Sequence, residues 1–258
     1  MGRRLTLVIL ATCACAALAG RGETLHGLRE HGELAGRAGE HGELAAQSTG
    51  SITGTISTSA KGLAPVRVTF DQKICGAELP DNAVVVDGQG HLANAVVILT
   101  GSRPFDSLPL AQGKRQTAAE TTVLNEKCHF APRVQIAKPN STVRTTSKDP
   151  ILHTTNAQRE SGKTIFNVAL PIAGLIISKP IGGAGTVRLS CNTHPWMRGW
   201  LIVTDDAAAV TGADGHFSLD NIPPGTYELR VWHESLKSAP QKVTVVAGLP
   251  SMVPVQMK

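Results

Sequence analysis

Apolar and polar residues alternate with a period of two over much of the chain, as in half-buried β-strands. The clearest case is Val66, Val68 and Phe70, which alternate with Arg67 and Thr69. Short β-branched or apolar runs predict further strands at 84–86, 95–99, 134–137, 142–146, 164–170, 175–178, 186–190 and 200–204. A polar stretch with two prolines at 101–120 predicts a long loop. Since no amphipathic helix longer than one or two turns is indicated, we expect an all-β protein.

The C-terminal part has the same alternating pattern, but its Gly and Pro turn residues are more closely spaced. The stretch GADGHFSLDNIPPGTYELRVW (212–232) predicts a turn, a strand, a Pro-Pro-Gly turn and a second strand. The stretch QKVTVVAGLPSMVPVQMK (241–258) adds two more strands. Short strands that repeat every 8–12 residues or so, separated by Gly and Pro turns, are typical of sandwiches and barrels.

The first 50 residues do not follow the strand pattern. Residues 1–19 read as an export signal, with a basic start, an apolar run and the small-x-small triplet Ala-Leu-Ala at 17–19. The apolar run is shorter than the ~20 residues of a spanning helix, so we expect cleavage; lipid attachment at Cys13 or Cys15 is the alternative. Residues 20–50 contain EHGELA twice and several glycines, which predicts a flexible linker. The protein is therefore expected to be periplasmic or secreted, without a membrane span.

Charge and composition narrow the class of protein. The formal net charge of +5 falls by two, to +3, when Arg3 and Arg4 leave with the signal. Without clustered Lys and Arg or a binding module, this excess argues against nucleic acid as a partner. Signal removal also leaves Cys75, Cys128 and Cys191, and an odd number of cysteines in an exported protein leaves one thiol without a disulfide partner.

The stretch CNTHPWMRGW (191–200) carries candidate chemistry, with Cys191, His194 and Met197 spaced three residues apart. Thiolate and thioether sulfur favour Cu(I), and imidazole suits both oxidation states of copper. Taken singly, the three could be a buried thiol, a surface imidazole and a core filler. Together on one loop between two predicted strands, they favour a metal site. Zinc is disfavoured because it prefers Cys, His or carboxylate to Met.

This loop resembles the copper loop of the cupredoxins of the amicyanin and plastocyanin type, with its Cys-x2-His-Pro-aromatic-Met order. Upstream, CHFAPRVQIAKPNSTVRTTSKDPILHTT (128–155) is similar to the pair of strands that ends in the family's first His ligand. The resemblance implies a Greek-key β-sandwich with a type 1 (blue) copper site, whose ligands would be His153, Cys191, His194 and Met197. His129 is the alternative to His153.

The resemblance carries further expectations. The family usually has Asn after the first His, near the thiolate, where this chain has Thr154, which can still donate a hydrogen bond. Its turn glycine is replaced around Asn140, and Asn tolerates that backbone. The His of the copper loop, here His194, is expected near the surface, with Trp196 beside it either exposed or folded inward. Assigning Cys191 to metal leaves Cys75 and Cys128 to pair; two unpaired buried thiols are the alternative.

The C-terminal stretch GADGHFSLDNIPPGTYELRVWHE (212–234) is similar to carboxypeptidase regulatory-like, transthyretin-type β-sandwich modules. Its ending Trp-His-Glu (232–234) is interpreted as strand-end packing. We therefore expect a signal peptide at 1–19, a linker at 20–50, a cupredoxin-like copper-binding domain at 51–204 and a regulatory-like module at 205–258.

The expected function is copper binding and one-electron transfer with an unidentified redox partner protein. Enzymatic activity is not expected, because a copper oxidase or reductase needs a second copper site and no His cluster for one can be assembled. The alternative is an extracytoplasmic structural or adhesive β-sandwich protein with a vestigial or non-redox metal site.

Overall fold

The computed structural model describes residues 48–102 and 121–258. Within these ranges the chain forms nineteen strands and one short helix, so the predicted all-β class is confirmed. No helix in the described residues is long and apolar enough to cross a membrane. The predicted signal at 1–19, nearly all of the linker at 20–50 and most of the loop at 101–120 lie outside the described residues.

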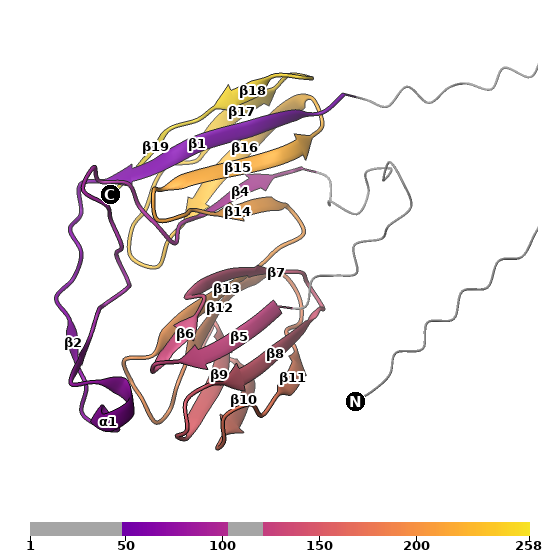
Figure 1. The fold of residues 1–258 in the computed structure, drawn as a ribbon. Coiled ribbons are helices and arrows are strands. Elements are labelled where there is room, and N and C mark those ends of the chain that lie inside the picture. The colour runs from indigo at the N-terminus through magenta and orange to yellow at the C-terminus, as the bar shows by residue number, and fades with distance from the viewer. Residues whose placement is uncertain (1–47, 103–120) are drawn as a thin grey trace, which may run out of the picture. The chain divides into compact units, whose positions relative to one another are not determined.

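Residues 121–203 form a sandwich of two sheets (Figure 1). One sheet has the order β10 (Thr164–Leu170), β9 (His153–Arg159), β12 (Gly185–Ser190), β13 (Arg198–Val203) and β7 (Val134–Ala137). The other has the order β11 (Ile177–Pro180), β8 (Thr142–Ser147), β5 (Thr121–Glu126) and β6 (His129–Ala131). Buried side chains of both sheets, such as Val123, Val143 and Leu189, belong to one apolar core. We call this unit the 121–203 sandwich.

A second sandwich combines strands from both ends of the described chain. One sheet has the order β15 (His216–Ile222), β1 (Gly50–Thr58) and β18 (Pro250–Met252), and β19 (Val255–Met257) also pairs with β1. The other has the order β14 (Ala207–Val210), β4 (Val96–Thr100), β16 (Gly225–Trp232) and β17 (Gln241–Val245). The pairing of strands therefore crosses the boundary predicted between 204 and 205.

The sequence of β1 suits a strand that packs in a core and lies close to its neighbours. Its side chains alternate between buried and half-buried, and Ile52 and Ile56 are buried in the same core as the C-terminal strands. Gly54 permits a close approach, because a Cβ at this position would lie 2.0 Å from the carbonyl oxygen of Val253. The C-terminal strands thus complete their sandwich with β1, a partner that local sequence does not reveal.

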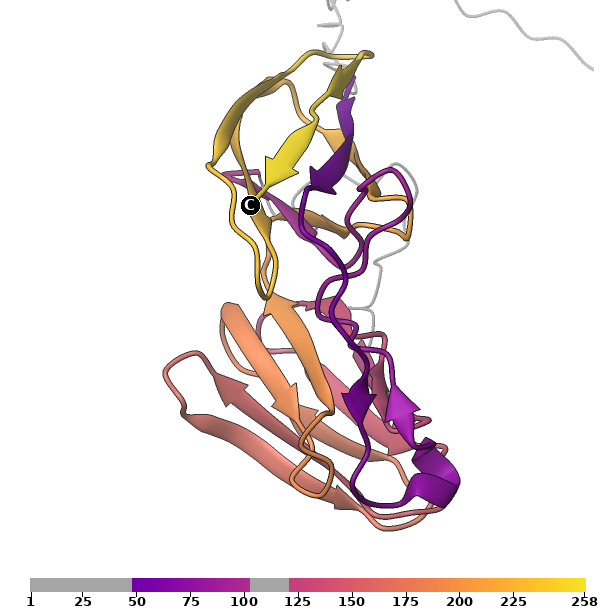
Figure 2. The same cartoon turned by 90° about the vertical axis from the view of Figure 1, so that its left-hand side faces the viewer.

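Residues 61–83, here called the strap, leave the second sandwich and run along the 121–203 sandwich (Figures 1 and 2). The strap contains the two-residue strands β2 (Val66–Arg67) and β3 (Glu78–Leu79), which pair, and the helix α1 (Gln72–Cys75) between them. A disulfide joins Cys75 to Cys128, which confirms the predicted pair. The strand predicted over 66–70 is shorter than expected and ends at 67, and the chain then turns at Asp71, the left-handed N-cap of α1.

The two sandwiches contact each other at the Trp-His-Glu stretch (232–234), which was predicted to pack a strand end. The rings of Trp200 and Trp232 meet edge to face, with centroids 5.3 Å apart. Glu234 accepts two hydrogen bonds from the guanidinium of Arg133, at 2.7 and 3.0 Å. His233 is buried, and its Nδ1 accepts backbone N–H groups at the end of β16. This stretch packs a strand end, as predicted.

Most predicted strands are present; one predicted strand is absent, and several strands, β9 among them, were not predicted. At 84–86 only the isolated bridge from Val86 to Leu92 forms. The strand β9, with sequence HTTNAQR, was not predicted as a strand because its side chains are mostly polar. Alternate positions of β9 are nevertheless buried, and neighbouring strands hydrogen-bond both of its edges.

Candidate metal centre

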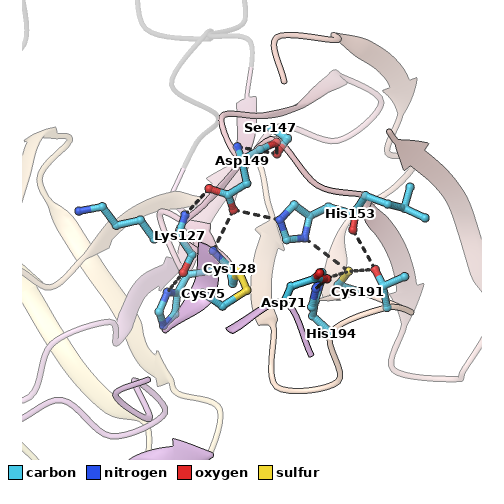
Figure 3. The surroundings of a disulfide bond; sticks show 12 residues. Asp71, Cys75, Lys127, Cys128, Ser147, Asp149, His153, Cys191 and His194 are labelled. Atoms are coloured by element: carbon cyan, nitrogen blue, oxygen red, sulfur yellow. Dashed lines mark hydrogen bonds and ion pairs between the residues drawn. A yellow bond between two sulfur atoms is a disulfide. The ribbon is translucent and has the colours of Figure 1, made fainter. Parts of the chain in front are cut away.

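Three of the four predicted ligands meet at one point inside the 121–203 sandwich (Figure 3). The Sγ of Cys191 and one ring nitrogen each of His153 and His194 lie within 4.8 Å of one another. The Sγ lies 3.9 Å from Nδ1 of His153 and 3.6 Å from Nδ1 of His194. Nitrogen and sulfur donors bound at the usual 2.0–2.3 Å in trigonal or tetrahedral geometry are about 3.6–3.8 Å apart. The three donors therefore fit a transition-metal ion.

Strand pairing brings these donors together. His153 begins β9, and β9 pairs antiparallel with β12, whose last residue, Ser190, precedes Cys191. The loop from β12 to β13 turns tightly, because the Met197 N–H donates to the His194 carbonyl at 3.0 Å. Met197 is buried in the same apolar core as Cys191. Its role as a fourth ligand stays a prediction.

The environment of Cys191 favours the thiolate. Its Sγ receives the backbone N–H of Thr154 at 3.3 Å and the Thr154 hydroxyl at 3.7 Å, so Thr does donate where the family has Asn. The hydroxyl of Thr193 lies 3.0 Å away. Burial opposes the charge, but hydrogen bonds, that from His153 first, outweigh it and lower the pKa of Cys191 from 9.0 to about 5. A thiolate is the form that binds metal.

The outer nitrogen of His153 is held by a buried carboxylate. Nε2 lies 2.9 Å from Oδ2 of Asp149, and Asp149 accepts the backbone N–H groups of Lys127 and Cys128 at 2.8 and 2.9 Å. Burial acts to lower the pKa of His153, but the Cys191 sulfur and Asp149 together raise it. This carboxylate–imidazole pair leaves Nδ1 for a metal and fixes the direction of the ring.

The predicted surface position of His194 is wrong. Its side chain is fully buried, and Nε2 lies 3.0 Å from Oδ2 of Asp71, which comes from the strap. Sequence reasoning missed Asp71 because 123 residues separate it from His194. The one available signal was Cys75, four residues further along the strap, whose pairing with Cys128 places this part of the strap beside the metal centre.

Two other predicted positions resolve clearly. Trp196 is half-buried against the core of the 121–203 sandwich, so it folds inward, and Phe70 of the strap stacks on it with ring centroids 6.4 Å apart. His129 contacts the Lys127 carbonyl and is not among the clustered donors of the described residues, so it does not replace His153. A group of Cys128, Asp149 and His153 is also close, but the Cys128 sulfur is in the disulfide.

Residues 196–258 match the family model of the carboxypeptidase regulatory-like domain. The match covers the strands from β14 onward and also β13, which lies in the 121–203 sandwich. It agrees with the predicted resemblance of the C-terminal stretch. No curated protein matches the chain.

Solved structures with similarity to this chain include cupredoxins, as the copper-loop resemblance implies. A purple cupredoxin from Nitrosopumilus maritimus shares 21% identity over 33% of this chain and 100% of its own, with a TM-score of 0.29. A reduced Cu(I) form of an amicyanin variant shares 20% identity over 42% of this chain and 98% of its own, with a TM-score of 0.28. A Cu-containing nitrite reductase from Thermus scotoductus SA-01 shares 21% identity over 37% of this chain and 26% of its own, with a TM-score of 0.29. With TM-scores this low, these likenesses give no information about function.

Proposed function

We propose that this is an exported type 1 copper protein that carries single electrons and is not itself an enzyme. The observation that supports it most is the convergence of a thiolate and two imidazole nitrogens in a buried site, with Met197 in the same core. Soft sulfur and borderline nitrogen donors are the set that suits both Cu(I) and Cu(II). Copper, when bound, supplies the one-electron step.

The chain's own residues prepare the site for that step. Asp149 orients the imidazole of His153, while Thr154 and Thr193 hold the sulfur of Cys191 in place. Both imidazoles are fully buried, which excludes water as an added ligand. Donors that are held in this way need to move little when the charge of the metal changes, and a small rearrangement favours fast electron exchange.

The proposed function also includes export of the protein and electron exchange with a redox partner protein. Residues 1–19 carry the features of an export signal, which would place the protein in the periplasm or outside the cell. An exported electron carrier needs a redox partner protein.

The test is copper binding by the purified protein, followed by optical and electron paramagnetic resonance spectra. We expect one equivalent of Cu(II) per chain and an intense visible band from thiolate-to-copper charge transfer. The variant His129→Ala serves as the matched control, because His129 lies next to Cys128 but outside the donor cluster, and it should bind and colour like the parent.

Two results would count against the proposal. Stoichiometric Cu(II) without the visible band would remove electron transfer through a thiolate site. Failure to take up copper at all would favour the alternative, an extracytoplasmic structural or adhesive protein whose metal site is vestigial.

A further inference from the structure

Asp71 has an unusual place in the strap. It is the N-cap residue that precedes α1, and its backbone is left-handed, with φ 52° and ψ 31°. An Asp at such a position commonly bonds a backbone N–H of its own helix, but the Asp71 side chain makes no such bond. Its carboxylate instead lies 3.0 Å from Nε2 of His194. The local conformation thus directs the carboxylate away from its own helix and to the metal centre.

The contact closes one side of the site. The side chain of His194 is 0% exposed while that of Asp71 is 46% exposed, so the carboxylate lies between the imidazole and solvent. Phe70, the preceding residue, stacks on Trp196, which in turn lies 5.2 Å from the ring of His194. Two successive strap residues therefore cover the copper loop.

The disulfide joins this cover to the other half of the site (Figure 3). Cys75 follows Asp71 by one turn of α1, and the Cys75 N–H donates to the Asp71 carbonyl at 2.9 Å. Its partner Cys128 donates its backbone N–H to Asp149, which contacts His153. The same cross-link thus supports both carboxylates that hold the outer nitrogens of the two imidazoles.

We propose that Asp71 is a positioning residue of the metal centre, and that the strap is a cover held over the His194 edge by the Cys75–Cys128 disulfide. The part that concerns metal rests on the proposed function. The cover itself is a property of the metal-free chain and can be tested without copper. Electrons and small molecules then reach His194 through or past the strap rather than through an open imidazole edge.

The first experiment uses the metal-free protein. Diethyl pyrocarbonate modifies accessible imidazoles, and peptide mass spectrometry gives the rate at each His, with the partly exposed His129 as the internal reference. The test variants are Asp71→Gly, which suits the left-handed backbone, and the double variant Cys75→Ser/Cys128→Ser. The matched control is Glu78→Gln, which removes an exposed carboxylate elsewhere on the strap.

We expect His194 to react slowly in the parent and in Glu78→Gln. In Asp71→Gly and in the double variant it should react about tenfold faster or more. If His194 reacts at the same rate in the parent and in Asp71→Gly, the strap is not a cover. Should the double variant fail to fold, Asp71→Gly still decides the question.

The second experiment measures the copper-loaded protein. Asp71→Asn keeps the backbone preference and removes the charge, and it should raise the reduction potential, because a nearby negative charge stabilises Cu(II) more than Cu(I). Removal of Cu(I) by a chelator should become about tenfold faster, as for other carboxylates that orient ligating imidazoles. Asp71→Glu, which retains the charge, should restore both values at least in part.

The outcomes separate the two proposals. If the parent binds no copper, the proposed function fails. The rate at which diethyl pyrocarbonate modifies His194 in the metal-free protein still tests whether the strap covers it. If copper binds but Asp71→Asn and Glu78→Gln shift the potential equally, Asp71 acts only as one more surface charge and its positioning role is overturned.

Discussion

The two sandwiches use the same alternation of buried and exposed residues but bury different chemistry. The core of the second sandwich is aliphatic apart from Phe217 and the sulfur of Met257. The core of the 121–203 sandwich holds the disulfide, Cys191 and Met197, and the buried polar side chains of His153 and His194 lie with Cys191 in the donor cluster. Buried polar groups destabilise a fold unless they are partnered. An apolar core thus requires only that apolar residues occupy alternate strand positions. The donor cluster also requires specific residue types, each with a hydrogen-bond partner.

Two buried histidines show the same contrast. In the second sandwich, burial lowers the pKa of His233, although Glu234 acts in the opposite direction. In the 121–203 sandwich, burial also acts to lower the pKa of His153, but the contacts with Cys191 and Asp149 raise it. Burial favours the neutral imidazole, and only close negative groups reverse that preference. The contacts that raise the pKa of His153 are the same ones that hold its ring beside Cys191 and Asp149.

The largest expected effect is at the thiolate. Cys191→Ser should abolish the intense band of the Cu(II) protein, because the band arises from thiolate-to-copper charge transfer. Cys75→Ser leaves all three clustered donors in place and should keep the band, although it opens the disulfide that holds the strap. Absorption spectra of the copper-loaded variants check this. A coloured Cys191→Ser protein would contradict the assignment of the ligand.

A cavity in the second sandwich should affect stability and leave the metal centre unchanged. Leu229 is 1% exposed in that core, and Leu229→Ala should lower the free energy of unfolding by about 2–5 kcal/mol. Urea unfolding measures the change, and the absorption of the folded copper protein should match that of the parent. An altered copper band would show that the two cores are coupled rather than separate.

A smaller effect is expected at Trp196, which lies over the metal centre with Phe70 stacked on it. Because Trp196 is only half-buried, we expect a partner that docks over this loop to contact it, and Trp196→Lys should slow reduction by a given donor protein about tenfold, because a desolvated charge opposes close approach. The matched control is Val246→Lys, at an exposed apolar position of the second sandwich. Stopped-flow absorption gives both rates. Equal rates with intact blue bands would place electron exchange elsewhere.

The smallest effect is the pH dependence due to His233. Its folded pKa is lower than the ordinary 6.5, so below pH 6.5 the unfolded chain binds a proton that the folded chain does not. Stability is therefore retained above 6.5 and falls as the pH drops towards the folded pKa, by at most about 1.4 kcal/mol per pH unit. His233→Asn should flatten this part of a thermal-unfolding profile.

The control for that profile is His216→Asn, which changes an exposed histidine of the same sandwich. It should leave the slope as in the parent. If His233→Asn and the parent lose stability equally between pH 6.5 and 5, other groups cause the loss.

The all-β class, most strands and the clustered donors at 191–197 could be predicted from the sequence alone. Period-two alternation and Gly or Pro turns are local signals, and Cys191, His194 and Met197 fall within seven residues of one another. The positive φ of 58° at Asn140 likewise follows from its residue type. His153 and the Cys75–Cys128 pair could be predicted only with a family resemblance and a count of cysteines.

Which strands share a sheet, and which residues surround the donors, depend on long-range packing that local sequence does not reveal. The pairing of β1 with β15, β18 and β19 joins residues from opposite ends of the described chain, and no local pattern specifies such a partner. The Asp71 contact buries His194, which the family resemblance placed near the surface. Period-two alternation predicts that a side chain is buried. Which residue covers it, such as Asp71 over His194, depends on long-range packing and on the disulfide.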